Sequence, residues 1–167
     1  LWHLLSMSAG VTSVSEVTAV VDEHWTRTFL ESRPSFEPGT AFRYNSMNSY
    51  MLSVIVRRIS GMGLAEFLTE RLWRPLGVRN FFCEYSPEDI EKGGWGMYIA
   101  PEDLLKIGQL FLQKGMWNGE RLLSEEWIEK MTTVTFYTAD ENKDYHYGLH
   151  MWVAADEKSW LFSGMLG

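Results

Sequence analysis

The chain has 167 residues, a formal net charge of −7 and a pI of about 5.1. Its 46% hydrophobic and 22% charged residues are typical of a globular domain with its own core and argue against disorder. The negative charge argues against non-specific binding to nucleic acid or anionic membranes, because both need a cationic surface. The sequence contains no run of about 20 apolar residues and therefore predicts no membrane span.

Helical periodicity dominates the first 135 residues. After a helical end at residues 1–8, it predicts helices over about 13–31, 46–60, 64–73, 101–114 and 125–131. Ser13 with Glu16 is a capping box, and Asn45 or Ser46 caps the next helix. Pro75 is expected to stop the third helix, because proline has no N–H to donate.

The segments between and after these helices carry turn and strand signals. Residues 76–99 are expected to be irregular, and residues 116–121 to form a turn. From Tyr147 to Val153 apolar residues alternate with others, which predicts a strand that pairs with a second strand over 160–165. The sequence therefore predicts an α+β, predominantly helical fold. We expect a helical region at 1–135 and the start of an antiparallel sheet at 136–167.

Tyr44 is the first candidate for chemistry. It lies between a Pro38-Gly39 turn and a predicted helix start, with small polar residues next to it at Asn45 and Ser46. A tyrosine in this place can point into a cleft, and the positive end of the helix dipole favours a phenolate there. A tyrosine that acts as a base near neutral pH needs a pKa roughly 3 units below 10, about 4 kcal/mol, so a nearby cation is also needed. The sequence leaves open that Tyr44 is a buried aromatic and Ser46 only a helix cap.

The second candidate is the sequence Phe162-Ser163-Gly164-Met165 on the last predicted strand. A small residue beside a glycine lets another backbone approach closely, although a bulge or a packing contact would use the same residues. Gly93–Gly96 lacks the context of a phosphate loop and is interpreted as a flexible turn. No histidine has a partner at metal-ligand spacing, so we expect neither a metal nor a cofactor.

Taken in chain order, these stretches resemble the serine β-lactamase and DD-peptidase (penicillin-binding-protein-like) family, nearest its class C and carboxylesterase-like branch. The matching segments are residues 4–10, 36–77, 96–131, 147–152 and 162–164. Each motif is weak alone, but their order and spacing are specific. The resemblance covers nearly the whole chain, and it implies the helical region and first antiparallel strands of the β-lactamase/transpeptidase-like fold.

The resemblance also implies a site. In this family a Ser-x-x-Lys helix supplies the nucleophile, and Tyr44 matches the tyrosine that accepts the serine proton. Ser46 stands where asparagine is usual, so the substrate-amide contact of that asparagine is expected to be shortened or lost. Phe162 stands where lysine or histidine is usual, and the loss of a cation that would help to bind a β-lactam carboxylate puts β-lactamase activity in doubt. Ser163 and Gly164 match the rest of the family's third motif, a Lys-Thr-Gly-type sequence on a late strand. The Met165 N–H would then be an oxyanion donor.

The chain has no Ser-x-x-Lys, and the family order would put that motif before Leu1. We therefore expect an internal fragment of a serine hydrolase that cleaves a small-molecule amide or ester and is inactive alone. The alternatives are a catalytically dead homologue that binds peptides or proteins, and a helical interaction domain without a site. The apolar strand at 160–165 predicts that the isolated chain pairs with another copy by strand exchange or edge pairing. The sequence assigns no cellular location.

Overall fold

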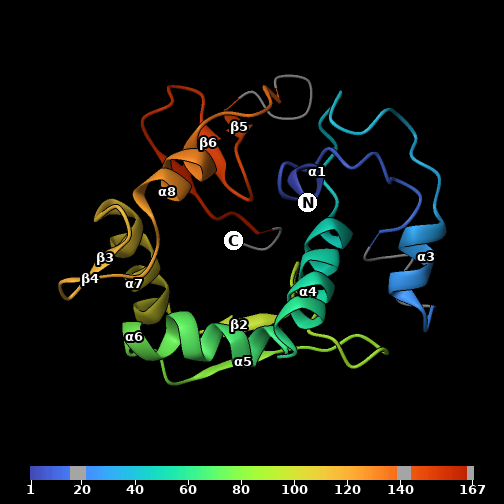
Figure 1. Ribbon diagram of the computed structural model, residues 1–167. Helices are drawn as coiled ribbons and strands as arrows, with labels where there is room; N and C mark the ends of the chain where they lie inside the picture. The colour runs from blue at the N-terminus through green and yellow to red at the C-terminus, as the bar shows by residue number, and fades with distance from the viewer. Residues whose placement is uncertain (16–21, 139–143, 165–167) are drawn as a thin grey trace.

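The computed structural model describes residues 1–15, 22–138 and 144–164 (Figure 1). Its helices are α1 (Trp2–Leu5), α3 (Trp25–Glu31), α4 (Ser46–Ser60), α5 (Leu64–Leu68), the π-helical η1 (Thr69–Trp73), α6 (Arg74–Leu76), α7 (Pro101–Leu112) and α8 (Glu125–Thr132). Its strands are β1 (Phe81–Cys83), β2 (Met97–Ile99), β3 (Met116–Trp117), β4 (Glu120–Arg121), β5 (Tyr145–Tyr147), β6 (Trp152–Ala154) and β7 (Trp160–Leu161). The described strand pairs are antiparallel, so the predicted α+β, predominantly helical class is confirmed.

Two hydrophobic cores hold these elements together. The first joins α1, α3 and α4, with Trp25, Phe29 and Tyr50 among its buried side chains. The second joins the helices from η1 to α8, with Trp73, Leu110 and other apolar side chains buried. In Figure 1, α1 and α4 lie opposite α7, α8 and the β5–β6 hairpin, and the α5–α6 run connects the two sides.

The first predicted helix is wrong as a single element. The structure describes residues 22–24 as non-helical, and α3 begins only at Trp25 (Glu16 of the predicted capping box lies outside the described residues). Asp22 explains the late start, because its side chain accepts hydrogen bonds from the His24 N–H and the Thr28 hydroxyl. Such local bonds from an aspartate compete with helix formation and favour a turn.

Helix α4 begins and ends where the sequence predicts. Asn45 is its N-cap: the side-chain oxygen accepts a bond from the Met47 N–H at 2.9 Å. The amide nitrogen of Asn45 donates to the carbonyls of Val11 at 2.8 Å and Val14 at 2.7 Å. Gly61 follows the helix in the left-handed conformation, with φ 73°. These three bonds fix the direction in which the chain enters α4, and Tyr44 is the residue just before this cap.

The prediction that Pro75 stops the third helix is wrong. Five π-helical residues, Thr69–Trp73, come directly before α6, and the chain stays helical through Pro75 to Leu76. A wider π turn accommodates the proline, whose ring would otherwise clash with the carbonyl four residues earlier. Gly77 ends the run with φ 70°.

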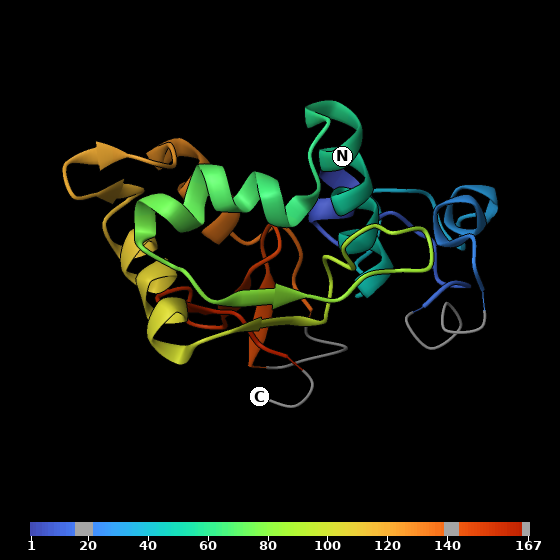
Figure 2. The same ribbon diagram turned by 90° about the horizontal axis from the view of Figure 1, so that it is seen from below.

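Two hairpins replace segments that were predicted as irregular or as a turn. Strand β1 pairs with β2, with Phe81 opposite Ile99, and Figure 2 shows this pair alongside the α5–α6 run. The rings of Trp73 and Phe81 lie 5.8 Å apart and join the two elements. Strand β3 pairs with β4 through Asn118 and Gly119, whose φ values of 49° and 86° fit the tight turn of a two-residue hairpin.

The predicted strand from Tyr147 to Val153 is two strands. Tyr147 ends β5 and pairs with Trp152, which begins β6, so residues 148–151 form the connection. The alternating residues are buried, as the pattern predicts, but Leu149 and Met151 are buried within the connection. Strand β7 pairs with β6, with Leu161 opposite Trp152, and its strand conformation ends there. The predicted strand over 160–165 is therefore only partly formed in the described residues.

Candidate active site

Tyr44 lies at one end of the β5–β6–β7 sheet, one residue before the cap of α4. Its side chain is 42% exposed, so it is not a buried aromatic. The Tyr44 ring stacks on the Trp152 indole, with centroids 5.7 Å apart and planes 18° from parallel. The Tyr147 ring meets the Tyr44 ring edge-on, at 6.1 Å and 84°. The Phe42 ring lies 5.1 Å from the Tyr147 ring. Together the rings of Phe42, Tyr44, Tyr147 and Trp152 form an aromatic patch.

The two tyrosines in this patch differ in environment. Tyr147 is buried and Tyr44 is exposed. Burial raises the pKa of Tyr147, and the negative charge of an ionised Tyr44 raises it further. Tyr147 therefore stays a neutral phenol at physiological pH. Tyr44 is the phenol of the pair that reaches solvent beside the N-terminus of α4.

Ser46 is the first residue of α4 and is buried. It is not the helix cap, because Asn45 has that role. A Cβ on Gly94 would lie 2.5 Å from the Ser46 carbonyl oxygen and 3.1 Å from the Ser49 Cβ. The Gly93-Gly94 backbone therefore packs directly on the first turns of α4, where small side chains leave room for it. This loop was predicted as a flexible turn, and its close fit to α4 was missed.

The third motif leaves the sheet at the end where Tyr44 lies. Leu161 pairs with Trp152, the residue on which Tyr44 stacks, and Ser163 comes two residues later. Ser163 and Gly164 are exposed. The Phe162 ring turns to α7 and contacts the Phe111 ring at 6.1 Å. Met165 lies outside the described residues.

The sequence analysis assigned no role at this site to His150, which contacts α4 beside the patch. His150 lies in the connection between Tyr147 and Trp152, and its Nε2 is 3.4 Å from the Ser49 Oγ of α4. Burial lowers the pKa of His150 to about 4, although a hydrogen bond to the Leu4 backbone partly opposes this. No pattern signals this role, because His150 reaches α4 only when the hairpin turns back at this position.

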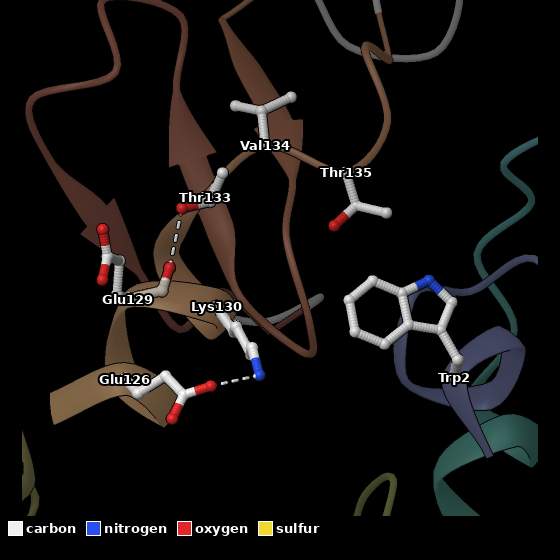
Figure 3. Close-up of a pocket in the computed structure, with 7 residues that line it drawn as sticks. All are labelled: Trp2, Glu126, Glu129, Lys130, Thr133, Val134 and Thr135. Atoms are coloured by element: carbon white, nitrogen blue, oxygen red, sulfur yellow. Dashed lines mark hydrogen bonds and ion pairs between the residues drawn. The ribbon is translucent and has the colours of Figure 1, made fainter. Parts of the chain in front are cut away.

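The structure also contains a cavity that is not lined by Phe42, Tyr44, Tyr147 or Trp152. It has a volume of about 490 Å³ and lies between α1 and α8. In Figure 3 the Trp2 ring faces Thr135 and Lys130 across this cavity, and the Lys130 ammonium lies 2.7 Å from Glu126. None of the five proposed residues that the structure describes, which are Tyr44, Ser46, Phe162, Ser163 and Gly164, lines it.

Neither a metal site nor a membrane helix is found in the described ranges. There, no three His, Cys, Asp or Glu side chains gather in a way that could hold a metal ion. None of the helices between residues 1 and 164 that the structure describes is long and apolar enough to cross a bilayer.

Comparison with known proteins identifies the family. A sequence model described as β-lactamase matches residues 1–167. The chain belongs to the β-lactamase family. The resemblance inferred from the sequence is therefore confirmed.

Solved structures agree with this β-lactamase family assignment. A Bacillus anthracis protein provisionally described as a 6-aminohexanoate-dimer hydrolase superimposes over 100% of this chain and 50% of its own, with a TM-score of 0.84 and 21% identity. A penicillin-binding protein from Bacillus halodurans superimposes over 91% of this chain and 55% of its own, with a TM-score of 0.72 and 18% identity. These likenesses confirm the β-lactamase/transpeptidase-like fold.

Curated proteins are also similar in sequence. The 6-aminohexanoate-dimer hydrolase of Paenarthrobacter ureafaciens is 29% identical over 91 residues, which is 54% of this chain and 23% of the relative. The chain thus spans a quarter to a half of the length of these proteins.

Proposed function

We propose that the protein containing this chain is a serine hydrolase that cleaves a small-molecule amide or ester through an acyl-enzyme, with Tyr44 as its base. The observation that carries the proposal is the exposed Tyr44 phenol at the N-terminus of α4, held by Trp152 and Tyr147 within a β-lactamase-family fold. The nucleophile is a serine of a Ser-x-x-Lys motif outside this chain.

In the proposed reaction the Tyr44 phenolate oxygen accepts the proton of the serine hydroxyl as the serine oxygen bonds to the substrate carbonyl carbon. The carbonyl π electrons move to its oxygen, then return to expel the amine or alcohol, which takes the proton from Tyr44. A water molecule then attacks the carbonyl carbon of the acyl-enzyme while the Tyr44 phenolate accepts its proton. The serine oxygen leaves and takes this proton from Tyr44. The acid is released, and both serine and phenolate are regenerated.

The surroundings of Tyr44 supply part of the stabilisation that a phenolate base needs. The aligned N–H groups of the 15-residue helix α4 favour negative charge near its start. A helix end contributes about 0.3–1 kcal/mol, well below what a phenolate at neutral pH needs. The lysine of the Ser-x-x-Lys motif would supply the remainder in this proposal.

The third motif has a separate role in the proposal. The Met165 N–H donates to the oxyanion, and Ser163 and Gly164 line the substrate cleft. This rests on the exit of Ser163 from the sheet two residues after Leu161, the pairing partner of Trp152. Ser46 stands where the family usually has asparagine, and its shorter side chain reduces or removes the substrate contact that the asparagine amide would make.

The proposal is tested with the 167-residue chain and with a longer protein that includes a Ser-x-x-Lys segment. We expect hydrolysis of a p-nitrophenyl ester by the longer protein only, and loss of at least a hundredfold in kcat with Tyr44→Phe. The 6-aminohexanoate dimer and a penicillin are the first natural-type substrates to compare, because relatives carry those names. Hydrolysis that persists in Tyr44→Phe would refute Tyr44 as the base.

A binding protein without catalysis is the second candidate. It is favoured by Phe162, which packs on Phe111 at the position where the family usually has a cation. A protein of this kind would bind peptides or protein partners at the same patch. An upstream segment that lacks either the serine or the lysine would decide for it.

Self-association of the isolated chain also stays a prediction. Strand β7 follows β6 at the edge of the described sheet order β5-β6-β7. An open edge strand offers its backbone groups to another copy. Multi-angle light scattering of the 167-residue chain should give the mass of a dimer, and a monomer at high concentration would contradict this.

A further inference from the structure

His150 occupies an unfavourable backbone conformation. Its φ is 53°, in the left-handed region that costs most non-glycine residues of the order of 1 kcal/mol. It lies in the connection between β5 and β6, whose flanking residues are Tyr147 and Trp152. These are the two rings that contact Tyr44. A strained residue at this place persists only when its surroundings determine its conformation.

Two contacts determine it. The His150 backbone N–H donates to the Leu5 carbonyl at 2.9 Å. The His150 Nε2 lies 3.4 Å from the Ser49 Oγ, within hydrogen-bond distance. His150 thus bonds to the end of α1 through its backbone and to α4 through its partly buried ring.

These contacts join the β5–β6 connection to helix α4, the two elements that lie next to Tyr44. Ser49 lies in the first turns of α4, whose cap directly follows Tyr44. We propose that His150 is a positioning residue for Tyr44: it fixes the turn between Tyr147 and Trp152 against α4, so that the Tyr44 phenol keeps one orientation. As far as catalysis is concerned, this rests on the proposed role of Tyr44 as base.

The orientation is measured without reference to activity. The complete protein is labelled with ¹³C in its tyrosine rings, and the Tyr44 signal is assigned with Tyr44→Phe. Stacking on Trp152 shifts the Tyr44 ring protons through the indole ring current. We expect this shift to be lost in His150→Gly and in His150→Asn, while the signal of Tyr50 in the first core is unchanged.

The matched control is Glu157→Gly. Glu157 has nearly the same φ, 57°, in the exposed turn between β6 and β7, where its N–H bonds to Ala154. This substitution relieves the same backbone strain without touching α4, and the Tyr44 signal should stay in place. An unchanged Tyr44 signal in both His150 variants would overturn the proposal.

Catalysis gives the second readout. In the active protein we expect His150→Asn and Ser49→Ala each to lower kcat about tenfold or more with KM nearly unchanged, because the base is misplaced while substrate contacts remain. The double variant should lose no more than either single one. Independent, multiplying losses would contradict the His150–Ser49 link. If instead Tyr44→Phe retains activity, the proposed base is wrong, while the ring-current result still decides the positioning.

Discussion

The ring of Tyr44 lies nearly parallel to the indole of Trp152, with centroids 5.7 Å apart. Such a pair contributes roughly 0.5–1.5 kcal/mol beyond the area that it buries. We expect a double-mutant cycle of Tyr44→Leu and Trp152→Leu, measured by urea unfolding, to give a coupling free energy in this range. A coupling free energy near zero would mean that the contact between the two rings does not stabilise the fold.

The stability of the protein should depend on pH through His150. Its pKa falls from 6.5 in the unfolded chain to about 4 in the folded one, mainly because of burial. Between these values the unfolded chain binds more protons, so the stabilisation is complete above pH 6.5 and is lost as the pH falls toward 4. The loss is at most about 3 kcal/mol.

Urea unfolding at several pH values tests this dependence. His150→Asn should flatten the curve of unfolding free energy against pH between 4 and 6.5. His24→Asn is the control, because His24 is exposed and at the N-terminal end of α3. An equally steep curve in His150→Asn would assign the pH dependence to other groups.

Gly94→Ala should destabilise the fold. An added Cβ would come within 2.5 Å of the Ser46 carbonyl oxygen, so the loop has to move away from α4, at a cost of about 1–3 kcal/mol. Gly108→Ala is the matched control in α7: it meets nothing within 4 Å and should stabilise the helix by about 0.5–1 kcal/mol. Thermal melting of both variants separates the clash from a general effect of alanine.

Glu88 should be important for the attachment of α3 to α4. One of its oxygens, Oε2, accepts from the Thr26 N–H at 2.8 Å, the Thr26 hydroxyl at 2.9 Å and the Tyr50 hydroxyl at 2.7 Å. Tyr50 is fully buried, and burial raises its pKa to about 12, so it remains a donor. Glu88→Gln should cost about 1–3 kcal/mol in unfolding free energy.

The control for Glu88→Gln is Glu126→Gln. Glu126 pairs with Lys130 across one turn of α8, and both side chains are exposed. An exposed pair of this kind contributes little to stability. Equal melting temperatures for the two variants would show that the Glu88 bonds do not hold α3.

Most helices could be predicted because their signals are local. Asn45 and Ser124 each cap the following helix with a side-chain oxygen, and Gly61 ends α4. Errors came where a local signal competes with its surroundings. Asp22 interrupts the apolar stripe by bonding to His24, and the π turn before Pro75 accommodates a residue that usually ends a helix.

The site could be predicted only in part. Tyr44 was found because a turn and a helix cap flank it in the sequence. Its neighbours Trp152 and Tyr147 follow more than a hundred residues later, and their contact depends on a reversal of the chain at 148–151. A strictly alternating pattern predicts a continuous strand there. Leu149 and Met151 are buried in the connection, and burial in a strand would give the same alternation of apolar residues in the sequence.

Helix α4 meets the Gly93-Gly94 backbone with serines, at positions 46, 49 and 53. The space at these positions admits little beyond a single carbon, so alanine fits where valine or leucine would separate the loop from the helix. An alanine scan of unfolding free energy would therefore report these positions as tolerant, whatever Ser49→Ala does to kcat. A scan with larger side chains would find them among the most restrictive of the chain, and libraries meant to stabilise this protein should keep them small.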